Sequence, residues 1–271
     1  MPTYLPQPLP GAMPGPPASP DHKRRAWCLG AASLLGLGGC ADTPTRPVAR
    51  RPPGAPLPFS TSTGIGGLPA GWYGEQLRRN LPATHYALAD LDGRRVVHAV
   101  AESSTSALRC EVDINPVQQP WLEWAWRVDE VPANATVADD AHDDSPARVM
   151  VAFDGDPALI SLRDRLFQDQ VELFTGVLLP FAMLMYVWDG QAPTESVWSY
   201  ARSSRIRYLV VESGNGATGQ WRHYRRNVVD DYRRVFGAAP GRVSGVGVAT
   251  DSDDLKIRTE AWFGDVRFDS R

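Results

Sequence analysis

The sequence predicts a mainly β protein whose two antiparallel sheets form a jelly-roll-like sandwich. Three observations predict it. Apolar and polar residues alternate with a period of two in many segments between residues 94 and 268, as is typical of strands with one buried face. Turn-rich joins separate these segments. Only two stretches have helical spacing, near 157–176 and near 229–236, so strands dominate the expected fold.

The period-two segments place individual side chains. In WLEWAWRV, residues 121–128, Trp124 and Trp126 share a face with apolar neighbours and are expected in the core, whereas Trp121 and Trp188 are expected to be partly exposed. In ALRCEVDI, residues 107–114, Cys110 alternates in phase with apolar residues, so we expect a buried thiol. The remaining predicted strands are 94–103, 147–153, 182–188, 204–213, 219–227, 242–250 and 259–268.

The longer predicted helix starts after Asp156-Pro157. Leu159, Leu162, Leu166, Leu173 and Phe174 recur at helical spacing, which predicts a helix that lies over the sandwich or its edge. The second, shorter helix is expected to close at Gly237.

The N-terminus predicts export and lipidation. A basic cluster, Lys23-Arg24-Arg25, precedes an apolar run from 26 to 39, which favours a signal peptide over residues 1–39. Leu37 to Cys40 resemble the bacterial lipobox, and Cys40 is then the lipidated residue. An ordinary secretory signal with an incidental cysteine and twin-arginine export stay open, as does Met13 instead of Met1 as the start. Ala41 after the cysteine points to the outer membrane, on the periplasmic face of the envelope.

Composition divides the rest of the chain. Residues 40–70 comprise the lipidated cysteine and a stretch rich in Pro, Gly, Ser and Thr, which predicts a disordered tether. Residues 71–271 show no second linker, so a single domain is expected. The net charge of −3 offers no basic field for nucleic acid. Cys110 is the one cysteine beyond Cys40, which excludes an internal disulfide in the mature chain.

Five strings in order resemble a known family: DDSPARVMVAFDG, LPFAMLMYVWDG, RIRYLVVESG, GQWRHYRRNVVDDYRRVFG and VATDSDDLKIRTEAWFGDVRF. They are similar to the DUF3047 family of secreted or lipid-anchored bacterial proteins of unknown function, over roughly residues 72–268. The resemblance implies no activity. Asp254 and Leu255 depart from the family pattern, which has Asn and Thr there, so a role of that amide or hydroxyl is in doubt. The final strands are also similar, more loosely, to jelly-roll carbohydrate-binding modules.

Two acidic strings are candidates for ligand binding. Asp143 and Asp144 precede a predicted strand in which Arg148 points away from the core and calls for a carboxylate partner. Asp251 and Asp253 lie in TDSDD, which lacks the glycine and glutamate of an EF-hand. Both strings stay open as hydrated turns, as ligand sites or as Ca²⁺ sites. No other cofactor is predicted.

A third string, WRHYRRNVVDDY, concentrates charge in residues 221–232. An ion-pair network of Arg225 or Arg226 with Asp230 or Asp231 is expected, and zinc is disfavoured because a single histidine is present. If the network lines a cleft with aromatic walls, sugars suit it. The further candidate residues for such a cleft are Tyr186, Trp188, Arg207 and Asn227.

Three functions remain open from the sequence. The first is an envelope lipoprotein whose β-sandwich binds a polar ligand such as a glycan. The second is a hydrolase of glycan or envelope polymer that uses Asp143 or Asp144 with Asp230 or Asp231 as acid and base. The third is a structural domain that contacts an envelope protein. No G-x-S-x-G or phosphate-binding loop is present to indicate another chemistry.

Overall fold

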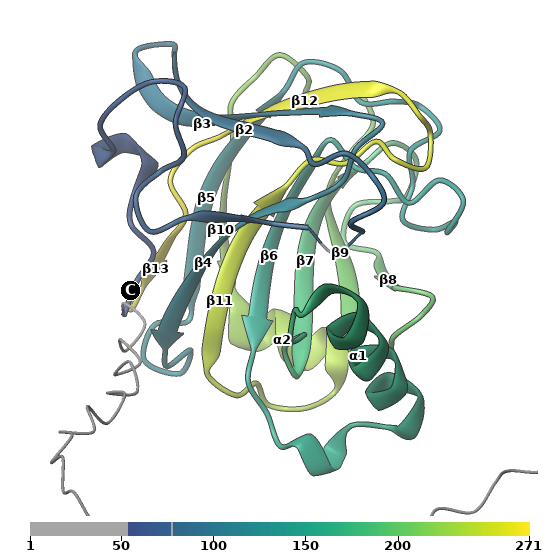
Figure 1. Cartoon of the computed structure of the whole chain (residues 1–271). Coiled ribbons are helices and arrows are strands. Elements are labelled where there is room, and N and C mark those ends of the chain that lie inside the picture. The colour runs from purple at the N-terminus through teal and green to yellow at the C-terminus, as the bar shows by residue number, and fades with distance from the viewer. Residues whose placement is uncertain (1–53, 77) are drawn as a thin grey trace, which may run out of the picture. The chain divides into compact units, whose positions relative to one another are not determined.

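The computed structural model describes residues 54–76 and 78–271, and it shows two β-sheets packed face to face (Figure 1). The seven-stranded sheet has the order β1 (Tyr73–Glu75), β4 (Ala107–Ile114), β11 (Val243–Ala249), β6 (Ala147–Phe153), β7 (Ala182–Asp189), β9 (Ile206–Ser213) and β8 (Val197–Ser199). The six-stranded sheet has the order β10 (Arg222–Asn227), β5 (Trp121–Val128), β12 (Arg258–Phe263), β3 (Arg94–Glu102) and β2 (His85–Leu91), with β13 (Arg267–Asp269) also paired to β5. The predicted fold class is therefore confirmed.

Two features of the sheets differ from the sequence prediction. β7 and β9 pair in parallel, because the chain crosses from one to the other through β8 and its flanking turns. β1, β2 and β8 were not predicted. β1 and β8 are only three residues long, and β2 mixes its two buried residues, Tyr86 and Leu88, with two alanines and one aspartate.

The core between the sheets is rich in aromatic side chains. Trp124 and Trp126 of β5 are buried, as predicted, and meet Tyr186 and Trp188 of β7 at ring-centroid distances of 4.9 Å and 6.3 Å. Cys110 is buried too, which confirms that prediction. Tyr186 and Trp188 thus face inward, which decides where a ligand site can lie.

The predicted signal peptide 1–39, the start at Met1 or Met13, Cys40 and the first part of the predicted tether all lie outside the described residues. The last part of that tether is packed. Phe59, in a short 3-10 helix (η1, Phe59–Thr61), is fully buried against Trp72, with ring centroids 4.7 Å apart. The structured part of the chain therefore begins before residue 59 rather than at residue 71. Among the described residues, no helix has the length and apolarity needed to cross a bilayer.

The shorter predicted helix is α2 (Val228–Phe236). The side chain of Asn227 caps its N-terminus by accepting hydrogen bonds from the backbone N–H groups of Val229 (3.0 Å) and Asp230 (3.2 Å). Gly237 closes it with a φ of 72°, a conformation that glycine adopts without strain. Asn227 is therefore a structural cap.

The longer predicted helix is α1 (Leu162–Thr175), which follows a 3-10 turn, η2 (Pro157–Leu159). The helix is confirmed, but the apolar residues that predicted it do not pack on the sandwich. Leu162, Leu166 and Leu173 are all at least 60% exposed. The side of α1 that faces the protein instead carries the buried Asp164, which accepts hydrogen bonds from the hydroxyls of Ser161 (2.6 Å), Ser203 (2.9 Å) and Ser204 (2.7 Å). A polar anchor, rather than the leucine stripe, sets the orientation of the helix.

Asp164→Ala is expected to lower the free energy of unfolding by about 2 kcal/mol at pH 7, because hydrogen bonds to a buried carboxylate are lost. Burial opposes ionisation of Asp164, yet the three serines lower its pKa to about 2. A lowered pKa in the folded state means that this stability is present above about pH 4 and is lost as the pH falls towards 2. Urea denaturation between pH 2 and pH 7 measures both effects. Asp169→Ala, at an exposed position of α1, is the control and should change little.

Candidate ligand-binding pocket

A row of side chains crosses the outer face of the seven-stranded sheet, the face turned away from the sandwich core. The strand registers align Arg109 with Gly247, Gly247 with Met150, Met150 with Met185, and Met185 with Tyr208. Gly247 is needed in this row, because a Cβ atom there would lie 2.6 Å from Cε of Met150 and 3.1 Å from Cγ of Arg109. The glycine lets the methionine side chain lie across the sheet.

Helix α1 covers this row and encloses a cavity of about 200 Å³. Phe167 and Val171, from the inner side of α1, contribute to its wall. The apolar part of the cavity, here called the methionine chamber, is lined by Met150, Met183, Met185, Ile206, Leu179, Phe167 and Val171. Methionine side chains are flexible and polarizable, so such a wall can adapt to the shape of an apolar group.

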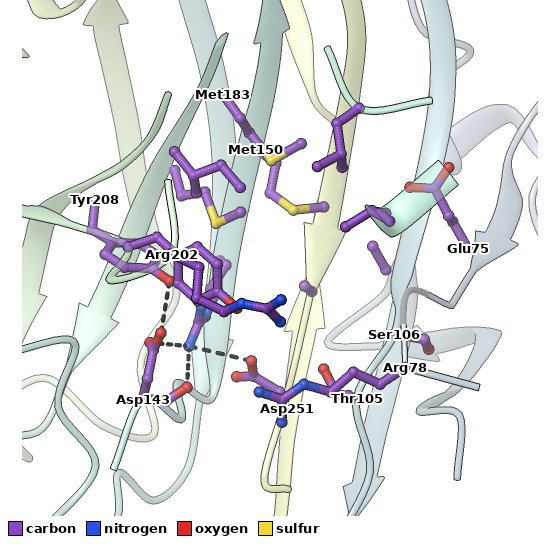
Figure 2. A pocket seen from close by; sticks show the side chains of 18 of the residues that line it. Glu75, Arg78, Thr105, Ser106, Asp143, Met150, Met183, Arg202, Tyr208 and Asp251 are labelled. Carbon is purple, nitrogen blue, oxygen red and sulfur yellow. Dashed lines mark hydrogen bonds and ion pairs between the residues drawn. The ribbon is translucent and has the colours of Figure 1, made fainter. Parts of the chain in front are cut away.

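One end of the cavity is charged. Nη2 of Arg148 lies 3.0 Å from Oδ1 of Asp143 and 3.2 Å from Oδ2 of Asp251, and the Tyr208 hydroxyl donates to Oδ2 of Asp143 at 2.7 Å. Figure 2 shows Met150 and Met183 towards one end of the pocket and Asp143 and Asp251 at the other. The pocket therefore has separate apolar and charged ends, which suits an amphiphilic ligand.

Carboxylates outnumber arginines at this charged end, here called the acidic end and defined as Asp143, Asp144, Asp251, Asp253, Asp254, Arg78 and Arg148. Arg78 is the second arginine, and it contacts Asp253 and, at 3.7 Å, Asp254. Arg148 is almost fully buried, and its Nε has no hydrogen-bond partner among the described residues. Two guanidinium groups thus face five carboxyl groups at this end. Arg202 and the Arg109–Glu75 ion pair also line the pocket, so carboxyl groups stay in excess there by six to four.

This imbalance shifts the ionisation of the carboxyl groups. Burial raises the pKa of Asp251 to about 8; Arg148 opposes the shift, and the neighbouring Asp144 and Asp143 reinforce it. Burial also raises the pKa of Asp143, again against Arg148. Burial and the nearby Asp253 raise the pKa of Asp254. At pH 7 Asp251 therefore holds a proton that an added positive charge would displace.

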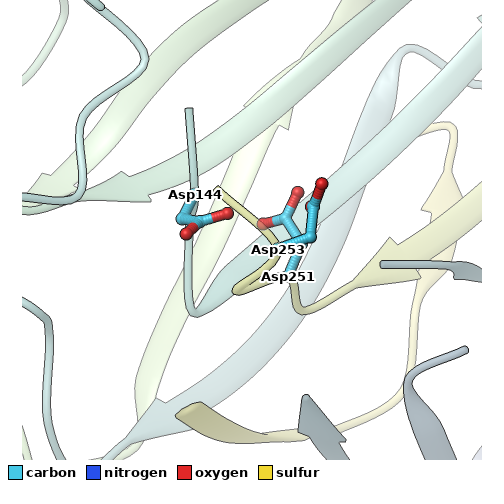
Figure 3. A group of neighbouring side chains, drawn as sticks. All are labelled: Asp144, Asp251 and Asp253. Atoms are coloured by element: carbon cyan, nitrogen blue, oxygen red, sulfur yellow. The ribbon is translucent and has the colours of Figure 1, made fainter. Parts of the chain in front are cut away.

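Asp144, Asp251 and Asp253 each offer an oxygen within 4.8 Å of the others (Figure 3). Such oxygens suit Ca²⁺, but backbone groups already use several of them. The oxygens of Asp144 accept the N–H groups of Asp254 (3.2 Å) and Leu255 (2.7 Å), and Oδ1 of Asp251 accepts that of Ser145 (2.8 Å). The triad therefore clamps the loop before β6 to the loop after β11. Asp254 and Leu255 bind Asp144 through their backbone N–H groups, so this contact does not depend on their side chains.

The predicted cleft with aromatic walls does not form. Tyr186 and Trp188 have no exposed surface, because both point into the core between the sheets. Trp188 was expected to be partly exposed at its strand end, but its indole N–H donates to the carbonyl of Gly214 at 2.9 Å. Neither residue can touch a ligand in the pocket.

The other predicted charged residues lie elsewhere. Arg226 and Asp231 form the expected ion pair, at 2.7 Å, and Asp231 also accepts a hydrogen bond from Tyr186. Because Tyr186 faces the core and Asp143 the outer face, Asp231 and Asp143 lie on opposite sides of the seven-stranded sheet. Asp230 is an exposed residue paired with Arg233 on α2. The predicted acid/base pairing of these aspartates across one cleft is therefore wrong.

Arg207 is also separate from the pocket, since it bonds to the Ser199 hydroxyl (2.6 Å) and lies beside Phe236.

The pocket contains part of the predicted set of site residues. Its lining includes Asp143, Arg148, Asp251 and Asp253, and Asp144 adjoins it. The residues that were missed are the methionines, Tyr208, Arg78 and the inner side of α1. The alternation that points Arg148 away from the core also points Met150 outward, and in β7 it does the same for Met183 and Met185.

Comparison with known proteins gives one family match. The profile described as "Protein of unknown function (DUF3047)" matches residues 70–267. A comparison with curated proteins found no match.

Two solved structures are similar at low level. The K3 adhesin domain of Lys-gingipain from Porphyromonas gingivalis W83 has 9% identity and a TM-score of 0.33, with 76% of this chain and 98% of that chain covered. Endoglucanase 3 of family GH12 from Trichoderma harzianum has 7% identity and a TM-score of 0.39, with 75% and 92% covered.

Proposed function

The chain belongs to the DUF3047 family of proteins of unknown function, and we propose that it is a lipid-anchored envelope protein that binds a small amphiphile with a positively charged group. The anchor is Cys40, at the periplasmic face of the outer membrane. The single observation that carries the ligand proposal is the excess of carboxyl groups over arginines at the acidic end, directly beside the methionine chamber.

The two ends of the pocket select the ligand by different forces. The chamber removes an alkyl or aryl group from water, which contributes about 25 cal/mol per Å² of buried apolar surface. A cation at the acidic end adds positive charge where several carboxyl groups share each arginine, in a site where water screens poorly. An anionic amphiphile would face the same carboxylates and be repelled.

The other two functions receive less support. A glycan site needs exposed aromatic faces for stacking, but the two predicted ones, Tyr186 and Trp188, are buried in the core. The aromatic residues that line the pocket, Phe167, Tyr200 and Tyr208, stand beside a wall of methionines. A polymer hydrolase needs an open cleft with two carboxyl groups across it, whereas this cavity of about 200 Å³ is partly closed by α1. A small ligand suits such a volume better than a polymer segment.

The test compares three ligands that share an eight-carbon chain: octylamine, octanoate and octyl glucoside. Isothermal titration of the protein is expected to give saturable binding of octylamine, with affinity at least tenfold above that for octanoate. Stronger binding of octyl glucoside than of octylamine would instead support the glycan function, and stronger binding of octanoate would contradict a cation site.

Met185→Trp locates the binding site. The larger side chain fills the methionine chamber from the sheet, so the affinity for octylamine is expected to fall at least tenfold, or about 1.4 kcal/mol. Met185→Leu keeps the volume and the apolar character and is the matched control, with binding retained. Thermal unfolding of both variants checks that they fold. Unchanged affinity in folded Met185→Trp would place octylamine outside the chamber.

A further inference from the structure

Helix α1 and its flanks expose an unusual amount of apolar surface. Six large apolar side chains in this one segment are between 60% and 79% exposed: Leu159, Leu162, Leu166, Leu173, Phe174 and Leu178, here called the α1 apolar surface. The other exposed large apolar residues in the described part of the chain are Leu57, Ile65, Leu68, Tyr73 and Val117. A concentration of this kind marks a surface that contacts an apolar partner.

Helix geometry gathers part of this surface into a stripe. Leu162, Leu166 and Leu173 are spaced by four and seven residues, so they project from the same side of a helix with 3.6 residues per turn. Phe167 and Val171 project from the opposite side and line the pocket. The leucines of this stripe are therefore not needed for packing within the fold.

Four arginines surround this surface, and none of them has a carboxylate partner in the part of the chain that the structure describes. Arg163 donates to the carbonyl of Ala201, Arg165 to that of Pro157 (3.3 Å), and Arg205 to that of Leu159. Arg202 donates to the side-chain carbonyl of Gln170 at 2.7 Å. Their positive charges are thus uncompensated by ion pairs.

The excess of positive charge is confined to the neighbourhood of α1. Over residues 54–271 the chain has 22 basic and 29 acidic residues, so the described part is acidic as a whole. Most of its other arginines are in ion pairs, for example Arg226 with Asp231 and Arg242 with Asp113. Between residues 159 and 178 and in the turn from 200 to 205, the exposed acidic residues are Asp169 and Glu172. Arginines outnumber acids there by four to two.

We infer that the α1 apolar surface docks on an anionic lipid bilayer. Leucine and phenylalanine side chains on one side of a helix, flanked by arginines, are the combination that binds the interface of membranes with acidic lipids. A lipid on Cys40 would leave residues 41–53 as the connection to the described part of the chain, which spans at most about 45 Å when fully extended. Such an anchor would hold the domain close to the membrane surface. This docking is a second membrane contact and does not depend on the ligand of the pocket.

The experiment uses the full chain with Cys28 and Cys40 replaced by serine, so that no acyl chain contributes. Co-sedimentation is measured with vesicles of phosphatidylcholine alone or mixed with phosphatidylglycerol. The wild-type surface is expected to bind the mixed vesicles at least tenfold more strongly than Leu166→Asp/Leu173→Asp does. Arg163→Gln/Arg165→Gln should lose the preference for phosphatidylglycerol. Val117→Asp, an equally exposed apolar residue in the turn between β4 and β5, should bind like the unsubstituted surface.

A fluorophore at one position distinguishes membrane binding through α1 from binding through residues 1–39, which all variants share. An environment-sensitive fluorophore on Leu166→Cys should shift to the blue with the mixed vesicles, whereas the same label on Val117→Cys should not. Equal binding by the Leu166→Asp/Leu173→Asp variant, together with no shift at residue 166, would overturn the proposal. So would lipid-independent self-association through these leucines in analytical ultracentrifugation, because a second copy of the chain would then cover the surface.

Discussion

Arg148→Met is expected to lower the free energy of unfolding by about 3 to 5 kcal/mol at pH 7, the cost of removing one partner from a buried ion pair. Arg148 is buried and contacts both Asp143 and Asp251 through Nη2. Methionine fills a similar volume but leaves these carboxyl groups with Arg78 as the remaining cation of the acidic end. Urea denaturation monitored by tryptophan fluorescence measures the change.

Arg258→Met is the matched control for Arg148→Met. Arg258 pairs with Glu102 and Glu260 on the surface, and its side chain is 54% exposed, so its removal is expected to cost less than about 1 kcal/mol. Adding Asp143→Asn to Arg148→Met removes the other carboxyl group that contacts Arg148 and should recover part of the loss. A loss below 1 kcal/mol for Arg148→Met would show that the arginine does not hold the acidic end together.

The stability of the protein is expected to fall between pH 5 and pH 8 by about 1.4 kcal/mol per pH unit from Asp251 alone. The pKa of this group is about 8 in the folded chain because burial disfavours the carboxylate, whereas in the unfolded chain it is near 4. Between these values the folded state binds one proton more than the unfolded state. The stabilisation is therefore fully present below about pH 4 and is lost as the pH rises through 8.

Asp251→Asn mimics the protonated side chain and should flatten this dependence. Its free energy of unfolding, measured in urea at each pH from 5 to 8, is expected to exceed that of the wild type increasingly as the pH rises. Asp230→Asn, on the exposed side of α2, serves as the control and should keep the wild-type slope. Parallel curves for wild type and Asp251→Asn would mean that Asp251 is ionised throughout this range.

Local sequence patterns were sufficient to predict the fold class and the contact between Arg148 and Asp143 in the pocket. The alternation in residues 147–153 placed Val149 and Val151 in the core and Arg148 outside it, because the period of a strand leaves only two faces to choose from. The turn residues Asp143 and Asp144 were identified as partners for Arg148 on the same grounds, and Asp143 is its partner. The sequence could not bring Asp251 and Arg78 to the same place, since their approach depends on the order of strands in the sheet.

The errors have physical causes in tertiary contacts. Trp188 ends a strand, but the loop at Gly214 caps its indole N–H and closes the core above it. The leucines of α1 have the spacing of a packed helix, yet the bonds from Asp164 to three serines turn that stripe outward. In both cases contacts with other segments accompany an orientation that the local pattern did not predict.

The most direct test of the central claim is the proton balance of octylamine binding at pH 7, measured by isothermal titration in buffers of different ionisation enthalpy. An ammonium group at the acidic end should ionise Asp251, so saturable binding is expected to release about one proton per octylamine, and Asp251→Asn should release almost none. Saturable binding without proton release, or no saturable binding, would contradict the proposal that the pocket receives a cationic amphiphile.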